Sequence, residues 1–80
     1  MKINTLFFGI TTDLAGTSQL EIKVDENISV QHFKNLIKEK YPNLKNINSY
    51  AIAVNESYAT DTVILNENDT VAIIPPVSGG

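Results

Sequence analysis

The chain carries its clearest helical pattern in residues 28–42, ISVQHFKNLIKEKYP. Ser29 stands where an N-cap accepts a hydrogen bond from an early helical N–H, and Ile28 and Phe33 occupy the two positions of a hydrophobic staple. Apolar side chains then recur at helical spacing on one face: Val30, Phe33, Leu36, Ile37 and Tyr41. Pro42 ends the pattern because proline pushes the residue before it out of the α region. The segment predicts one amphipathic helix that covers one face of a sheet.

Strand patterns lie on both sides of this helix. Residues 2–8 are apolar on both faces, which is typical of a central strand, and residues 20–24 alternate apolar and charged side chains. Residues 9–18 between them contain many turn formers and are predicted to be a loop that joins the two strands into a hairpin. After the helix, residues 50–54 predict a third strand and residues 58–59 a short edge strand.

The last strand is predicted over residues 71–74, which are all apolar. It follows a polar turn in which Asn68 tolerates a positive φ. The order strand, strand, helix, strand, short strand, strand predicts an α+β protein of the β-grasp (ubiquitin-like) type, a mixed sheet with one main helix packed on one face. The 80 residues allow one domain. We expect a β-grasp domain over residues 1–75 and an extended, flexible tail over residues 76–80.

Composition and charge exclude several classes of protein. The net charge is −3, and all six basic residues are lysines between Lys2 and Lys45, so the second half of the chain is acidic. This distribution argues against nucleic acid and favours a basic protein partner, although an acidic half can also be a solubilising surface. The chain has no cysteine, hence no disulfide and no thiolate metal site. Without a signal-like or membrane-length apolar run, we expect a cytoplasmic protein with no membrane partner.

The C-terminal segment is unusual because an apolar strand runs directly into two prolines and then a diglycine. Pro75 and Pro76 offer no N–H to a sheet, so they are predicted to end the ladder and direct the tail away from it. The tail continues as Val77-Ser78-Gly79-Gly80. The two glycines carry no Cβ and fit a narrow channel, which makes the carboxylate of Gly80 the predicted reactive group. The alternative is an ordinary mobile terminus in which small residues collect. A proline-rich ligand would need a PxxP repeat, which is absent.

The chain resembles, over essentially its whole length, the small sulfur-carrier subunits of molybdopterin synthase. The most specific parts are Leu6-Phe7-Phe8-Gly9, Ala53-Val54-Asn55, and residues 65–80, which end in Pro-Pro-Val-Ser-Gly-Gly. Two departures from the family pattern are visible. Asn68 stands where the family often has glycine, and Thr11-Thr12-Asp13 lacks the basic residue often found in that loop.

The resemblance implies that the chain works through partners. An adenylating, ubiquitin-activating-like enzyme would use ATP to adenylate Gly80, and a sulfur-donating enzyme would allow conversion to a thiocarboxylate. The tail would then donate its sulfur to a pterin precursor inside the large subunit of the synthase. The protein would thus be non-catalytic alone, the donor subunit of a transferase complex, with no permanently bound cofactor and no metal. Two alternatives stay open: a ubiquitin-like modifier joined to lysines through Gly80, and a sulfur carrier of the thiamine pathway.

Three apolar residues are the candidate partner contacts. Strand parity places Phe8 and Ile74 on the face away from the helix, side by side if the first and last strands are neighbours. Tyr58 joins them through its position in the resemblance. The alternative is scattered surface apolar residues, which any protein has. His32, the one histidine, has no convergent partner by spacing, so neither a metal site nor acid–base chemistry is predicted for it.

Overall fold

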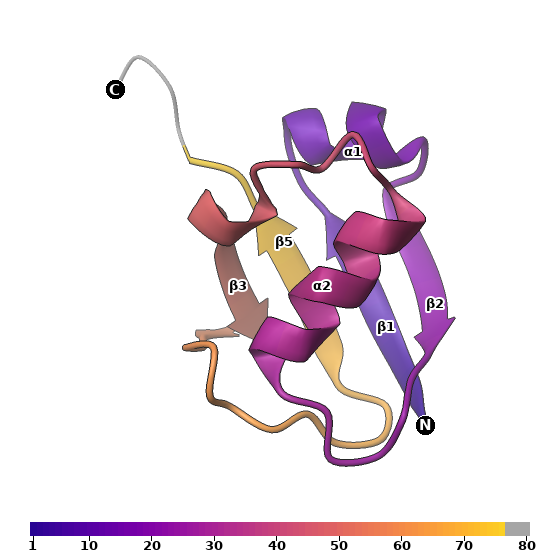
Figure 1. Ribbon diagram of the computed structural model, residues 1–80, viewed down its shortest axis with the longest axis vertical. Helices are drawn as coiled ribbons and strands as arrows, with labels where there is room; N and C mark the ends of the chain where they lie inside the picture. The colour runs from indigo at the N-terminus through magenta and orange to yellow at the C-terminus, as the bar shows by residue number, and fades with distance from the viewer. Residues whose placement is uncertain (77–80) are drawn as a thin grey trace.

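The computed structural model describes residues 1–76 and contains a five-stranded mixed sheet with one long helix across one face (Figure 1). The strand order is β2-β1-β5-β3-β4, in which β1 and β5 are parallel and the other pairs are antiparallel. The predicted β-grasp fold is therefore confirmed. The elements in chain order are β1 (Lys2–Phe7), α1 (Ile10–Ala15), β2 (Gln19–Lys23), α2 (Val30–Lys40), the 3-10 helix η1 (Ile47–Ser49), β3 (Ala51–Val54), β4 (Ser57–Tyr58) and β5 (Thr70–Ile74).

The loop predicted over residues 9–18 is wrong in its middle, where the short helix α1 forms. Gly9 precedes the helix, and Gly16 ends it in the left-handed region at φ 78°. The hydroxyls of Thr11 and Thr12 donate to the carbonyls of Phe8 and Phe7, which fixes the first turn against the end of β1. Threonine has a low helix propensity, so the sequence of this segment predicts a turn. The helix forms because the two hydroxyls hydrogen-bond to the end of β1.

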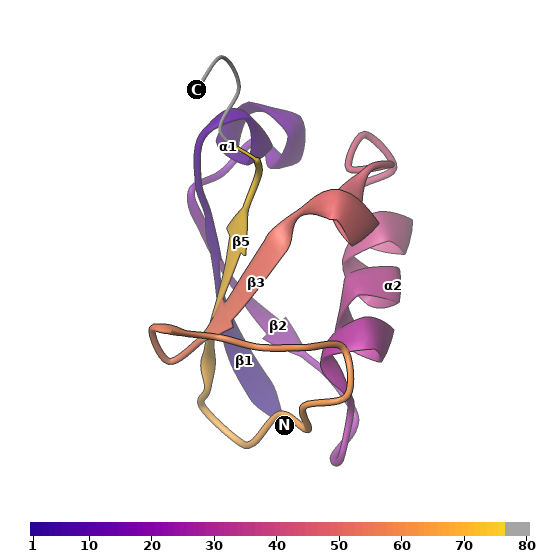
Figure 2. The ribbon, with the colours of Figure 1, turned by 90° about the vertical axis from the view of Figure 1, so that its left-hand side faces the viewer.

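The sheet and α2 form two layers with the core between them (Figure 2). In β1 the side chains of Ile3 and Phe7 face α2 and are buried, whereas Leu6 lies on the opposite face. In α2 the buried apolar residues are Val30, Phe33 and Ile37, as the helical spacing predicts. The predicted helix and the predicted strand faces are thus confirmed, with strand limits that shift by one residue.

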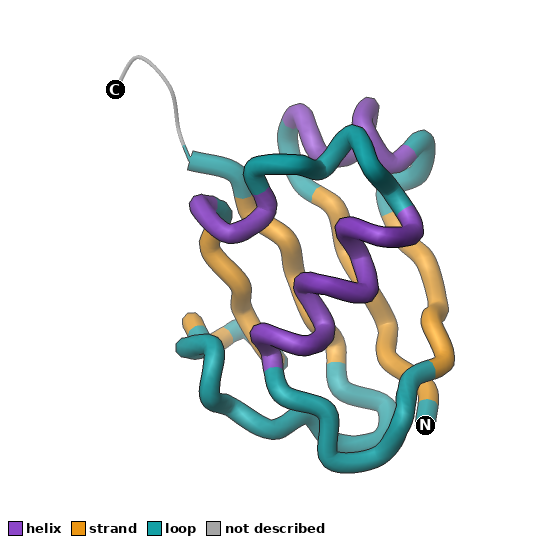
Figure 3. Tube along the Cα trace, viewed as in Figure 1, coloured by secondary structure: helices purple, strands orange, loops and turns teal. Residues whose placement is uncertain are grey.

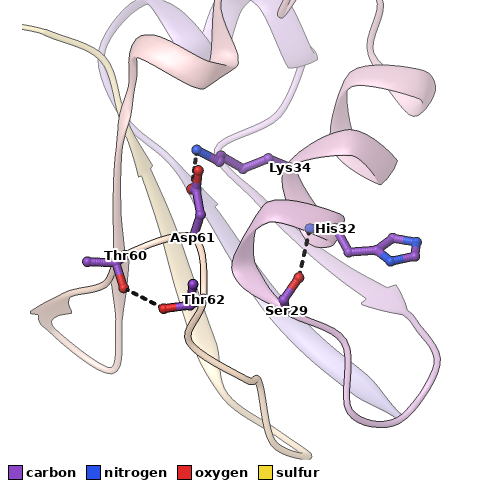
Figure 4. A network of polar contacts seen from close by, with 6 residues as sticks. All are labelled: Ser29, His32, Lys34, Thr60, Asp61 and Thr62. Atoms are coloured by element: carbon purple, nitrogen blue, oxygen red, sulfur yellow. Dashed lines mark hydrogen bonds and ion pairs between the residues drawn. The ribbon is translucent and has the colours of Figure 1, made fainter.

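The beginning of α2 is fixed by a local N-cap and by polar contacts to a distant part of the chain (Figure 4). The Ser29 hydroxyl accepts a hydrogen bond from the backbone N–H of His32 at 3.1 Å, which confirms the predicted N-cap. Within α2, the Lys34 ammonium lies 2.6 Å from a carboxylate oxygen of Asp61, in the long loop between β4 and β5. The backbone N–H of Val30 also donates to the carbonyl of Val63 in that loop. Figure 3 shows the loop passing the N-terminal end of α2, and these contacts hold it there.

A second polar cluster organises the entry into β5. The carboxylate of Asp69 accepts hydrogen bonds from the Asn55 amide at 2.9 Å and from the backbone N–H of Asn66 at 2.8 Å. The side-chain Oδ1 of Asn55 in turn accepts a hydrogen bond from the backbone N–H of Thr70 at 3.0 Å. Asn68 adopts φ 66°, as the turn prediction requires. The β3–β4 turn and the start of β5 are therefore held together by side chains as well as by the sheet.

Two fully buried threonines give a stability prediction with its own matched control. Among residues 1–76 the Thr5 hydroxyl has no hydrogen-bond partner, whereas the Thr11 hydroxyl donates to the backbone carbonyl of Phe8. Replacing Thr5 by Val removes an unsatisfied buried polar atom and should raise the free energy of unfolding by about 1 kcal/mol. Thr11→Val loses a hydrogen bond and should lower it by about 1 kcal/mol. Urea denaturation of both variants checks this, and equal effects of the two changes would contradict it.

Candidate functional site

The face of the sheet turned away from α2 carries a contiguous apolar surface, which we call the outer-face patch. No helix covers this face over β1, β5 and β3 within residues 1–76 (Figure 2). The patch is built from outward-facing positions of four neighbouring strands and from Phe8, just beyond β1. Its members are Leu6, Phe8, Tyr58, Ala72, Ile74 and Ala53, of which Ala53 is 8% exposed.

Strand pairing brings these residues together from distant parts of the sequence. Parallel pairing of β1 with β5 sets Leu6 beside Ala72 and Phe7 beside Ile73, so Phe8 and Ile74 lie on the outer face next to each other. The predicted proximity of Phe8 and Ile74 is confirmed. Tyr58 enters the patch from β4, where it pairs with Ala53. Whether the three residues bind a partner stays a prediction.

The patch is exposed to an extent that is unusual for large apolar side chains. Phe8 keeps 48% of its surface accessible and Tyr58 keeps 79%. Between them lies a hollow of about 310 Å³, bordered also by Glu56 and Thr70. Scattered apolar residues are normal on a protein surface, whereas a contiguous apolar cluster with a hollow is typical of a binding surface.

The patch leads directly to the point where the chain leaves the sheet. Ile74 is the last residue of β5 and pairs with Ala51; Pro75 and Pro76 follow without entering the ladder. The sheet thus ends where the two prolines begin, as the missing N–H groups predict. The remaining tail residues of the sequence prediction, Val77, Ser78, Gly79 and Gly80, lie outside the described residues.

Gly9 lies against the first of these prolines. Its backbone has φ 55° and ψ −136°, a conformation open to glycine and strained for other residues. A Cβ at this position would come 3.2 Å from the Cγ of Pro75. The end of β1 therefore approaches the exit of β5 closely, and the exposed Ile10 stands beside this contact at the start of α1.

The acidic second half of the chain is used largely for structure. Asp61 pairs with Lys34, Asp69 accepts hydrogen bonds in the β5 entry cluster, and Glu67 accepts one from the backbone N–H of Lys2 at 2.6 Å. Glu56 is different, because its side chain makes no hydrogen bond or ion pair within residues 1–76. Of the carboxylates in the described part of that half, Glu56 is thus the one available to a basic partner at the patch.

The described part of the chain offers little other chemistry. A larger, more polar hollow of about 420 Å³ lies beside Met1 and Glu67. Figure 1 shows the N-terminus at the end of the molecule away from the C-terminal end of β5. Neither this hollow nor any other part of residues 1–76 groups three metal-binding side chains, and His32 is exposed. No helix in that range is long and apolar enough to cross a bilayer.

The sequence analysis missed three members of the patch: Leu6, Ala53 and Ala72. Parity alone would have found Leu6 and Ala72, because they lie two residues before Phe8 and Ile74 on the same strand faces. Ala53 needed the β3–β5 register, which no local pattern supplies.

The sequence and the fold are both similar to known proteins. The ThiS family matches residues 5–80. The molybdopterin synthase sulfur carrier subunit of Arabidopsis thaliana is 35% identical over 81 residues, covering 100% of this chain and 84% of that protein. SAMP1 from Haloferax volcanii has a TM-score of 0.89 at 20% identity, with 100% of both chains covered, a likeness of fold alone. A chain in a complex of subunits 1 and 2 of the Helicobacter pylori molybdopterin-converting factor has a TM-score of 0.71 at 26% identity, again with 100% of both chains covered.

The neighbouring residues Phe7 and Phe8 test the assignment of the two faces. Phe7 is 3% exposed, so Phe7→Ala should lower the free energy of unfolding by about 3–5 kcal/mol. Phe8 keeps about half of its surface exposed, so Phe8→Ala should cost less than about 1.5 kcal/mol. Chemical denaturation of the two variants checks the difference. Equal losses would show that Phe8 is a core residue and not part of an exposed patch.

Proposed function

The chain belongs to the ThiS family, and we propose that it is the sulfur carrier subunit of a molybdopterin synthase. The observation that carries the proposal is the continuity of the outer-face patch with the exit of β5 at Pro75. A surface that docks a partner at this point delivers the end of the chain to that partner. The 35% identity to a sulfur carrier subunit of molybdopterin synthase over the whole chain favours this pathway over the thiamine pathway.

In the proposed cycle, the Gly80 carboxylate is the group that reacts. A carboxylate is a poor electrophile, so an adenylating enzyme first joins it to the AMP portion of ATP and releases pyrophosphate. Hydrosulfide delivered by a sulfur-donating enzyme then attacks the acyl carbon and displaces AMP, which leaves a thiocarboxylate. Adenylation makes the second step feasible because AMP is a far better leaving group than oxide.

Delivery of the sulfur takes place in the large subunit of the synthase. The outer-face patch docks on that subunit, and the tail places the thiocarboxylate next to the pterin precursor. The thiocarboxylate sulfur is a soft nucleophile that forms a carbon–sulfur bond to the precursor as an oxygen substituent leaves that carbon. Water then cleaves the acyl–sulfur bond of the resulting thioester, which returns Gly80 to a carboxylate and leaves the sulfur on the pterin. The Helicobacter pylori complex, in which two subunits of a molybdopterin-converting factor are bound together, supports such docking.

We assign the catalytic groups of this cycle to the partner proteins. Residues 1–76 contain no cluster of metal-binding side chains, and His32 lies exposed on α2 without an orienting group. General acid–base catalysis needs positioned groups within hydrogen-bond reach of the substrate, which we assign to the partners. The protein is then a substrate-like donor subunit of a transferase complex, and we place it in the cytoplasm with its partners.

The proposal predicts a defined change in mass. Incubation with the adenylating enzyme, ATP and the sulfur-donating enzyme should raise the intact mass of the chain by about 16 Da, the replacement of one oxygen by sulfur. Intact-protein mass spectrometry measures this. Isopeptide adducts on lysine-containing proteins in place of that shift would favour the ubiquitin-like modifier, and an unchanged mass would contradict both.

Removal of Gly80 gives the matched control. The truncated chain should show no mass increase under the same conditions, because its new terminus does not reach the adenylating site. Its thermal unfolding should be unchanged, since the core lies within residues 3–73. A truncated chain that still gains sulfur would contradict the assignment of Gly80 as the reactive end.

A further inference from the structure

The hollow in the outer-face patch exists because two alanines stand at its centre. Ala72 pairs with Ala53 across β5 and β3, and the same row continues outward to Leu6 and to Tyr58. Side chains paired in this way have Cβ atoms about 4.5–5.5 Å apart, so two methyl groups leave space that larger side chains would fill. From β1 to β4, this row therefore has a large side chain at each end, Leu6 and Tyr58, and two small ones in the middle, Ala72 and Ala53.

The next row closes the hollow toward the exit of the chain. Phe8 and Ile74 form this wall, and the whole hollow measures about 310 Å³. Its border contains few polar groups, chiefly Glu56 and Thr70. A small-molecule site requires several convergent polar groups that fix orientation, and this hollow does not present them.

We propose that the hollow receives one large apolar side chain projecting from the surface of the partner protein, beside a lysine or arginine that pairs with Glu56. A side chain seated on Ala53 and Ala72 would be surrounded by Leu6, Phe8 and Tyr58 and removed from water. Such central, desolvated anchors carry most of the affinity of protein interfaces. The rings of Phe8 and Tyr58 also allow edge-to-face contact if the anchor is aromatic.

The charge of the border points to the same kind of partner. The Glu56 carboxylate has no side-chain partner within residues 1–76, so it can pair across an interface without breaking a contact of the free protein. The lysines of the chain all precede residue 46, and none is among the residues that line the hollow. A partner with a basic group next to its apolar anchor would therefore be complementary in both respects.

Two other occupants fit less well. Residues 77–80 could reach at most about 13–14 Å beyond Pro76, and they would have to reverse direction directly after two prolines with fixed φ to return to Ala72. A second copy of the chain, docked by two-fold symmetry, would bring two Glu56 carboxylates toward the same interface. A separate basic partner requires neither a reversal of the tail nor the approach of two Glu56 carboxylates.

The direct test of the anchor is a substitution that fills the hollow with a larger side chain of this chain. The choice of binding partner rests on the proposed function, so the probe is the purified large subunit of molybdopterin synthase from the same organism. Ala72→Leu adds three carbon atoms to the floor and should weaken binding at least about 30-fold in isothermal titration calorimetry. Tyr58→Ala removes an exposed wall of the hollow and should weaken binding about 10-fold or more, without affecting folding.

Asn35→Leu is the control for the introduced leucine. It places the same apolar side chain on the exposed surface of α2, in the other layer of the fold, and should leave the affinity unchanged. Glu56→Lys should slow association with the large subunit, and this effect should shrink as salt is raised. Circular dichroism of each variant separates lost binding from lost folding. If Ala72→Leu does not fold, Tyr58→Ala and Glu56→Lys decide the result.

The outcomes separate this inference from the proposed function. If the unmodified chain binds the large subunit and Ala72→Leu and Tyr58→Ala bind equally well, the anchor is overturned and the proposed function stands. If the unmodified chain does not bind at all, both are overturned. A dimer of the free chain that Ala72→Leu abolishes, or tighter binding after removal of residues 77–80, would replace the proposed occupant with a second copy or with the tail.

Discussion

The parallel pairing of β1 with β5 is the constraint on which the rest of the structure depends. It sets Phe7 beside Ile73 in the core and, by alternation, Phe8 beside Ile74 on the outer face. One register thereby fixes the packing beneath α2, the apolar patch on the opposite face, and the position at which the chain leaves the sheet. A slip of one residue in this pair would exchange core and surface, so the fold and the outer-face patch are specified together.

Much of this arrangement could be predicted from local patterns. The spacing of Val30, Phe33 and Ile37 identified the helix and its buried face, and the alternation in residues 2–8 separated Phe7 from Phe8. The prolines after Ile74 marked the end of the sheet because they lack a donor. These features depend on properties of neighbouring residues, which the sequence displays directly.

The remaining features depend on contacts between distant residues. Helix α1 is held by the hydroxyls of Thr11 and Thr12, residues that otherwise favour extended or turn structure. The pair of Lys34 with Asp61, and the hollow over Ala53 and Ala72, join segments that lie far apart in the chain. A single alanine in a strand does not predict a hollow. The hollow arises because Ala53 and Ala72 are paired across the ladder.

In the proposed cycle, the described body of the protein positions the tail, and the chemistry takes place at Gly80. The most direct test is a semisynthetic chain whose Gly80 carboxylate is converted to a carboxamide, assayed for molybdopterin formation with the large subunit, the adenylating enzyme, ATP and the sulfur source. Our expectation is that this chain binds the large subunit as tightly as the unmodified one and supports no product. Product formation at the unmodified rate would contradict it.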